Sequence, residues 1–220
     1  MRTYEEFYPD NWEWRPAQPA YKRLVSGVGT NDADYATQPR INGKQLKCPA
    51  YIIWCCMLDR CYNTGFHPRR PTYVGTSVVE SWLRFSNFRE WYFRRREALQ
   101  SFGYTGPLEL DKDILSDSKT YSPKTCLLVP PDLNKLLNAV ANRRGPNPIG
   151  VSPTSRSSTF RARVRIDGRR EEKGGFDTPE EAAAWRLQKK LEYVRNYPLP
   201  PWLDETIVRR RLLKIVRNQK

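Results

Sequence analysis

The sequence predicts an α+β fold in which helical segments precede a three-stranded antiparallel sheet packed on one helix. Apolar residues recur at helical spacing after Pro49 and again after Asn87. From Thr159 to Asp167 apolar residues and arginines alternate with a period of two, which is typical of a half-buried strand. The Asp167-Gly168 pair that follows is a strong two-residue hairpin signal. With 220 residues, the chain can hold one large or two small domains.

The N-terminal elements are an irregular arm and two helices. Residues 1–45 are rich in Pro, Tyr, Trp, Asn and Asp without a sustained period, which favours an irregular arm that packs by its aromatic rings. Pro49 opens a helix that ends before Asn63, with an apolar stripe at Tyr51, Trp54, Cys55 and Leu58. A second helix is expected from about Asn87 to Leu99, with Asn87 and Glu90 at capping-box spacing. It ends in three arginines, 94–96, which suit either the helix dipole or phosphate groups.

A compact β-β-α unit is expected next. Residues 108–115 are strand-like, 116–119 form a turn, and 121–129 form a second strand before a short helix that holds Asn134. The first globular domain is therefore placed at 46–141. Residues 142–147 contain Gly and Pro between polar residues and are expected to be a linker.

The last module is predicted at 148–197. After the hairpin, Thr178 and Glu181 form a capping box with Pro179 at the first helical position. Residues 184, 187, 191 and 194 of this helix are expected to cover the strand face that carries Phe160 and Val164. A basic amphipathic helix, from about residue 204 within 198–220, is expected to dock on the protein, with a second nucleic-acid-binding element as the alternative.

The strand from Thr159 to Asp167 places three guanidinium groups on one face. Because side chains alternate, Arg161, Arg163 and Arg165 point away from the apolar face, about 7 Å apart, close to the spacing of phosphates along a nucleic-acid strand. Like charges on one face repel each other, so a polyanion is the expected partner. We expect further contacts from Arg156, Arg169 and Lys173.

The charge distribution points to the same end of the chain. The protein has 38 Lys and Arg against 24 Asp and Glu, for a formal charge of +14. Residues 141–220 hold 19 of the basic and 9 of the acidic residues. This asymmetry favours nucleic acid as the partner and places the contact surface in the C-terminal third.

Other protein classes are disfavoured by composition. No apolar run approaches the roughly 18 residues of a membrane span, and the first residues lack the apolar stretch of a secretory signal. Five cysteines, three of them within 55–61, favour reduced thiols in a cytoplasmic setting. A structural zinc is not expected, because no Cys-x-x-Cys pair occurs and His67 lies in a loop.

Several motifs occur in an order that resembles one known group of proteins. They are Ser26-Gly-Val-Gly-Thr-Asn-Asp-Ala-Asp-Tyr35, Cys48-Pro-x-Tyr51, Trp54-x-x-Met-Leu-x-Arg-Cys-Tyr62, Arg70-Pro-Thr-Tyr73, Trp82-Leu-x-Phe-Ser-Asn-Phe88, Leu110-Asp-Lys-Asp113, Tyr121-Ser-Pro-x-Thr-Cys126 and Pro148-Ile-Gly-Val-Ser152. This series resembles tailed-phage HNH-type, homing-endonuclease-like proteins that end in a domain similar to the plant ethylene-response-factor (AP-two) DNA-binding fold. The resemblance covers about residues 24–196. It implies an HNH-like nuclease domain at 46–141, a domain at 148–197 that reads double-stranded DNA, and a phage protein acting in the cytoplasm of an infected bacterium.

The resemblance also implies an active site in the β-β-α unit. Asp111 falls at the acidic metal ligand and Asn134 at the ligand on the helix, and both suit a divalent metal such as Mg²⁺ or Mn²⁺. Lys112 stands where the family has its His base, with Asp113 beside it. An unperturbed lysine has a pKa of about 10.4, so Lys112 acts as a base only if burial lowers that value; otherwise it is an electrostatic clamp.

Departures from the family pattern leave two functions open. The 116–119 loop lacks the family's Gly-Asn-Lys, and Val79 replaces a frequent Cys. The alternative to a metal-dependent endonuclease is a DNA-binding or virion-associated protein that keeps the fold without cleavage, with Asp111 and Asp113 as ordinary partners of Lys112 and Lys119. An RNA-binding protein would share the charge, but it usually exposes stacking aromatic rings, which the arginine strand lacks.

Overall fold

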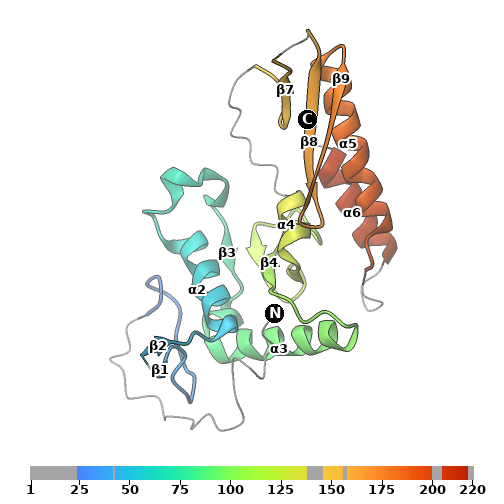
Figure 1. Cartoon of the computed structure of the whole chain (residues 1–220). Coiled ribbons are helices and arrows are strands. Elements are labelled where there is room, and N and C mark those ends of the chain that lie inside the picture. The colour runs from blue at the N-terminus through green and yellow to red at the C-terminus, as the bar shows by residue number, and fades with distance from the viewer. Residues whose placement is uncertain (1–23, 42, 138–145, 156–157, 200–204, 218–220) are drawn as a thin grey trace. The chain divides into compact units, whose positions relative to one another are not determined.

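The computed structural model describes residues 24–41, 43–137, 146–155, 158–199 and 205–217 (Figure 1). The fold is mixed α+β, as predicted, and the chain divides into two compact units, Met1–Leu128 and Val129–Lys220. The part of the predicted arm that precedes residue 24 lies outside the described residues. No helix in the described ranges is long and apolar enough to cross a membrane.

Helix α2 (Pro49–Tyr62) forms the core of the first unit and confirms the predicted bounds. Pro49 occupies its first turn and Asn63 is its C-cap residue. Trp54 and Leu58 are fully buried, while Tyr51 and Cys55 are half-buried. The predicted apolar stripe therefore faces the core, with Tyr51 and Cys55 partly exposed to solvent.

Helix α3 (Phe85–Ser101) packs on α2 through a cluster of aromatic rings, but its bounds differ from the prediction. It begins two residues before Asn87, so Asn87 is not its N-cap residue. The Asn87 side chain instead donates to the carbonyl of Ser81. The helix continues to Ser101, so the arginines 94–96 lie inside it and not in its last turn. Arg96 is only 9% exposed, which removes it from solvent. The dipole interpretation of the triplet is therefore wrong.

The start of α3 is capped from a distant part of the chain. Arg84, in the N-cap position, provides no capping side chain. Instead, Asp32 accepts hydrogen bonds from the backbone N–H of Ser86 at 2.8 Å and from its hydroxyl at 2.7 Å. The segment 24–45, expected to be irregular, thus has a defined role, and it also contains the hairpin β1 (Arg40–Ile41) and β2 (Lys44–Gln45).

The strands of the first unit are shorter than predicted. The expected strand at 108–115 is β4 (Glu109–Asp111), because a turn begins directly after Asp111. The expected strand at 121–129 is two strands, β5 (Thr120–Tyr121) and β6 (Leu127–Val129), separated by a turn. Strand β4 pairs with β6, and β5 runs parallel to β3 (Ser77–Val78). Three short 3-10 helices complete this part, η1 (His67–Arg69), η2 (Pro71–Tyr73) and η3 (Glu80–Leu83).

The second unit contains the predicted three-stranded antiparallel sheet. After helix α4 (Pro131–Leu137) come β7 (Val151–Pro153), β8 (Phe160–Ile166) and β9 (Arg169–Phe176), in the order β7-β8-β9. Asp167 and Gly168 connect β8 to β9 with φ angles of 50° and 71°. Positive φ at both positions is the signature of the hairpin turn that Asp-Gly predicts.

Helix α5 (Pro179–Asn196) covers one face of this sheet (Figure 1). Its predicted cap is confirmed, because Thr178 accepts from the N–H of Glu181 at 3.2 Å and Glu181 accepts from the N–H of Asp177. The predicted packing face is confirmed at Val194, which is fully buried, but Ala184 is exposed and Ala182 is buried instead. Ala182 packs with Val151 and Ala162, and Phe160, Phe176, Ala183 and Trp185 surround them.

Helix α6 (Glu205–Arg217) docks on α5, as predicted. Its buried residues Val208, Leu212 and Val216 follow each other at intervals of four, which places them on one side of the helix. Arg209 of this helix donates to the backbone carbonyls of Val194 at 2.7 Å and of Tyr197 at 3.1 Å. It thereby supplies donors to carbonyl groups at the end of α5 that lack helical partners.

Candidate functional site

The outer face of the sheet, opposite α5, carries four arginines around one carboxylate. Directly opposed residues of antiparallel strands share a face, and β8 pairs Arg163 with Glu172 and Arg165 with Arg170. Arg161 lies opposite Ser152 of β7 on the same side. We call this surface the arginine face; it consists of Ser152, Arg161, Arg163, Arg165, Arg170 and Glu172.

Glu172 holds three of these guanidinium groups together. Its carboxylate accepts from Arg163 at 2.7 Å and from Arg170 at 2.8 Å, and Arg161 lies 3.5 Å away. The hydrogen bonds from Arg170 and Arg163 lower the pKa of Glu172. The sequence-based expectation that only a polyanion offsets this row of charges is thus corrected, because Glu172 neutralises part of it. The face still has a formal charge of +3, and the side chains of Arg161, Arg163 and Arg170 are 38% to 55% exposed.

Two expected nucleic-acid contacts lie on the other face. Arg169 pairs with Ile166 and Lys173 with Ala162, whose side chains face α5. Glu171, in the same alternation, forms an ion pair with Lys189 of α5 at 3.3 Å, which confirms the orientation. Arg169 and Lys173 are exposed, but the structure does not bring them together with the arginine face. Arg156 lies outside the described residues.

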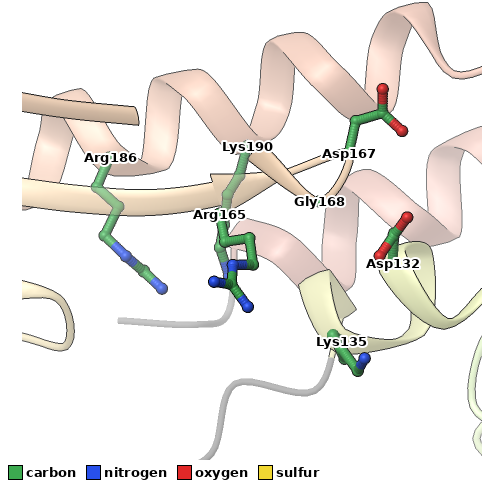
Figure 2. A pocket seen from close by; sticks show the side chains of 7 residues that line it. All are labelled: Asp132, Lys135, Arg165, Asp167, Gly168, Arg186 and Lys190. Atoms are coloured by element: carbon green, nitrogen blue, oxygen red, sulfur yellow. The ribbon is translucent and has the colours of Figure 1, made fainter. Parts of the chain in front are cut away.

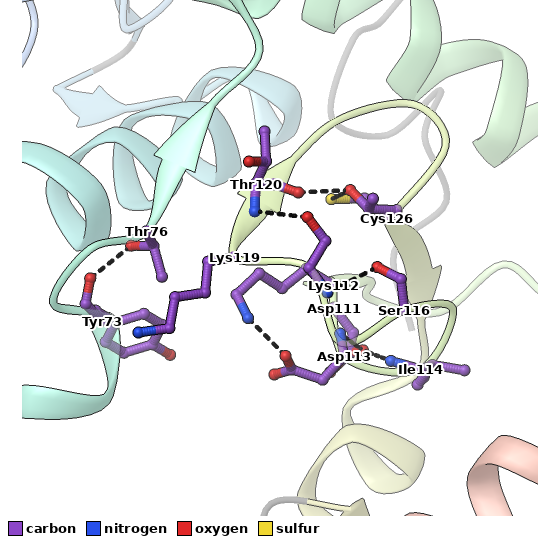
Figure 3. Close-up of polar contacts among 12 residues, drawn as sticks. Tyr73, Thr76, Asp111, Lys112, Asp113, Ile114, Ser116, Lys119, Thr120 and Cys126 are labelled. Atoms are coloured by element: carbon purple, nitrogen blue, oxygen red, sulfur yellow. Dashed lines mark hydrogen bonds and ion pairs between the residues drawn. The ribbon is translucent and has the colours of Figure 1, made fainter.

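The expected metal ligand Asp111 is a buried carboxylate at the end of β4. It is 7% exposed, and its Oδ1 accepts the backbone N–H groups of Asp113 and Ile114, each at 2.9 Å (Figure 3). Burial raises the pKa of Asp111, and these two hydrogen bonds offset the effect only in part. Because both N–H groups donate to Oδ1, the backbone of the following turn fixes the orientation of the carboxylate.

Lys112 lies beside this carboxylate but is directed to Asp113. Its Nζ is 2.5 Å from Oδ1 of Asp113 (Figure 3). The same atom is 5.9 Å from the centre of the Tyr121 ring. Its side chain is only 11% exposed. Contacts with a carboxylate and with a ring face are typical of a cation, so this geometry suits an electrostatic clamp.

Other candidate metal ligands are dispersed within the part of the chain that the structure describes. Asn134, the other expected ligand, is 9% exposed on α4 and belongs to the second unit. Among the residues that the structure describes, no three His, Cys, Asp or Glu side chains gather as a metal-binding group. All five cysteines are free thiols. His67 Nε2 is 3.0 Å from the carbonyl of Arg60, which agrees with a structural role for this histidine.

Sequence reasoning missed Arg170 and Glu172, although the signal was present. A two-residue turn at 167–168 pairs residue 166 with 169, so 165 must pair with 170 and 163 with 172. It also missed Arg60, whose guanidinium carbon lies 5.7 Å from the centre of the Tyr73 ring. No pattern in the sequence connects these residues.

The comparisons with known proteins leave the family open. The chain matches no family model, no curated protein and no solved structure. The resemblance to HNH-type proteins therefore stays a prediction that rests on the quoted motifs. The structural support for a function comes from the arginine face and from the Asp111 carboxylate with Lys112 beside it.

Proposed function

We propose that the protein binds double-stranded DNA through the arginine face of its second unit. The observation that carries the proposal is the presence of four guanidinium groups and one carboxylate on a single exposed sheet face. Such a face attracts DNA phosphates whatever the base sequence. A guanidinium group can also donate two hydrogen bonds to the O6 and N7 atoms of guanine. The resemblance to phage proteins with a sheet-reading DNA-binding domain supports the same proposal.

The arrangement of Glu172 favours DNA recognition over simple charge attraction. By holding Arg163 and Arg170 at fixed positions, it reduces the side-chain freedom that these arginines lose on binding. A network of this kind orients the guanidinium planes before the ligand arrives. RNA remains the less favoured partner, because the arginine face includes no aromatic ring on which an unpaired base could stack.

Fluorescence anisotropy with a labelled duplex of 20–30 base pairs tests this proposal. We expect binding by the full chain whose affinity falls steeply between 50 and 200 mM salt. Arg163→Ala should weaken binding and reduce the slope of log K against log salt by about 0.9. Arg169→Ala, with the same charge change on the opposite face of the hairpin, should change the slope much less. Equal effects of the two substitutions would exclude the arginine face as the contact surface.

A second candidate function, metal-dependent cleavage of DNA, rests on the first unit. The supporting observation is the buried and oriented carboxylate of Asp111 beside the nearly buried ammonium of Lys112. Bound Mg²⁺ or Mn²⁺ would stabilise the charge that grows on the phosphate and on the leaving oxygen. Lys112 would add positive charge next to it. The family resemblance adds Asp113 to this proposed site and implies action inside an infected bacterial cell.

Nicking of supercoiled plasmid separates an endonuclease from a binder. The substitution Asp111→Asn keeps an oxygen that can accept both backbone N–H groups, so it removes the charge with little change of fold. We expect nicking by the parent with Mg²⁺ or Mn²⁺, loss of nicking with Asp111→Asn, and full activity with Asp117→Asn as the charge-matched control. If the parent protein binds duplex DNA but does not nick the plasmid, the protein is a non-catalytic DNA-binding protein.

A further inference from the structure

A pocket in the second unit is lined mainly by cationic side chains. Its volume is about 140 Å³, well above the ~10–15 Å³ that a single water requires by the same measure. Four elements contribute to it: α4, the end of β8, the hairpin turn and α5 (Figure 2). The lining residues are Asp132, Lys135, Arg165, Asp167, Gly168, Arg186 and Lys190.

The described residues that line this pocket include more cations than carboxylates. Four cations face two carboxylates, for a formal charge of +2 with all side chains ionised. Within the part of the chain that the structure describes, Arg165, Arg186 and Lys135 form no ion pair, although both carboxylates line the same pocket. Lys190 is 4% exposed, and burial together with Arg186 lowers its pKa to about 8. Bringing Lys135, Arg165 and Arg186 together is unfavourable unless an anion joins them.

Arg186 is held so that its outer nitrogens remain available. Its Nε donates to the backbone carbonyl of Arg163 at 3.2 Å. The guanidinium passes over Gly150, where a Cβ atom would lie 2.7 Å from Nε and 2.7 Å from the same carbonyl oxygen. Only glycine leaves this space, and its φ of +75° also favours glycine. In Figure 2 the guanidinium groups of Arg186 and Arg165 both point into the pocket.

We propose that this pocket is a phosphate-binding site, with Arg165 and Arg186 as paired forks and Lys135 and Lys190 as additional charges. Planar guanidinium groups match the geometry of a tetrahedral oxyanion and donate two hydrogen bonds each, and ammonium groups contribute charge. The phosphate can come from a DNA backbone or from a free anion or nucleotide. The proposal does not depend on duplex binding by the arginine face, of which only Arg165 is a member.

Thermal unfolding of the full chain with inorganic phosphate tests the site. At constant ionic strength, phosphate should raise the midpoint temperature relative to chloride. We expect Arg165→Gln and Lys135→Gln, both at exposed positions, each to weaken phosphate binding about tenfold. Arg170→Gln removes the same charge from the arginine face outside the pocket and should leave phosphate binding unchanged. No stabilisation by phosphate, or equal loss in all three variants, would overturn the proposal.

Competition with DNA identifies the source of the phosphate. If the pocket holds a backbone phosphate, Lys135→Gln should reduce the salt slope of duplex binding by about 0.9, and inorganic phosphate should displace the duplex beyond the effect of ionic strength. If the site takes a free anion, phosphate should stabilise the protein while duplex binding is unaffected by Lys135→Gln. Failure of the parent to bind any duplex would refute the proposed function and leave the phosphate result standing.

Discussion

The substitution Glu172→Gln gives the sharpest test of the arginine face. It removes one negative charge from the centre of three guanidinium groups while it keeps the size of the side chain and one carboxyl-type oxygen. The ion pairs at 2.7, 2.8 and 3.5 Å are exposed to solvent, which screens them, so we expect only a small loss of unfolding free energy. The formal charge of the face rises from +3 to +4.

The effect on DNA binding should have the opposite sign. One more uncompensated guanidinium can neutralise one more phosphate, which makes the slope of log K against log salt steeper by about 0.9. Over a fourfold change in salt, from 50 to 200 mM, this corresponds to about a 3.5-fold additional change in affinity. Non-specific duplex should therefore bind more tightly at low salt, even though the folded protein is slightly less stable.

Glu171→Gln is the matched control for this experiment. Glu171 is the adjacent residue of β9, it also forms an ion pair, and it faces α5. Both variants have the same net charge, so a general effect of charge would appear in both. Anisotropy titrations at several salt concentrations should show the steeper slope for Glu172→Gln alone. Identical slopes for the two variants would refute the argument that the arginine face meets the phosphates.

Three further predictions concern stability. Asp32→Ala should lower the unfolding free energy by about 1–2 kcal/mol in urea denaturation because it removes the cap of α3, whereas Asp34→Ala, at a surface ion pair with Arg89, should cost less than about 1 kcal/mol. Arg209→Ala should cost about 2 kcal/mol, measured the same way, through its lost bonds to the α5 carbonyls; the exposed Arg210→Ala should be close to neutral. The lowered pKa of Lys190, about 8, means that the unfolded chain holds this proton more tightly. The difference in unfolding free energy between the parent and Lys190→Met should therefore rise by about 2 kcal/mol from pH 8 to pH 10 and stay level below pH 7. If this difference does not change with pH over the whole range, the prediction is wrong.

Elements with local signals were predictable. The Pro49 start and Asn63 end of α2, the Thr178 cap of α5 and the Asp167-Gly168 turn each depend on residues close together in the sequence. The α+β class and the sheet-on-helix packing follow from these elements. Predictions failed where distant residues decide the outcome. The start of α3 was placed at a capping box, because nothing in the local sequence shows that Asp32 provides the cap.

The candidate sites show the same division. Alternation in β8 correctly grouped Arg161, Arg163 and Arg165, since a strand has a period of two. Placing Arg169 and Lys173 with them ignored the register that the two-residue turn imposes. The phosphate pocket was beyond reach, because its cations come from α4, β8 and α5 and only the tertiary fold joins them. The same holds for the burial of Asp111, which no pattern of charged residues around it indicates.

The cap that Asp32 provides to α3 has a consequence for the order of folding. The capping residue and the Ser86 amide are separated by 54 positions, so the first turn of α3 is completed only after this long loop has closed. Closing a loop of that length costs chain entropy before the cap can form, which makes the helix start a late event. Substitutions at Asp32 should then speed unfolding and leave the folding rate nearly unchanged, with a φ-value close to zero.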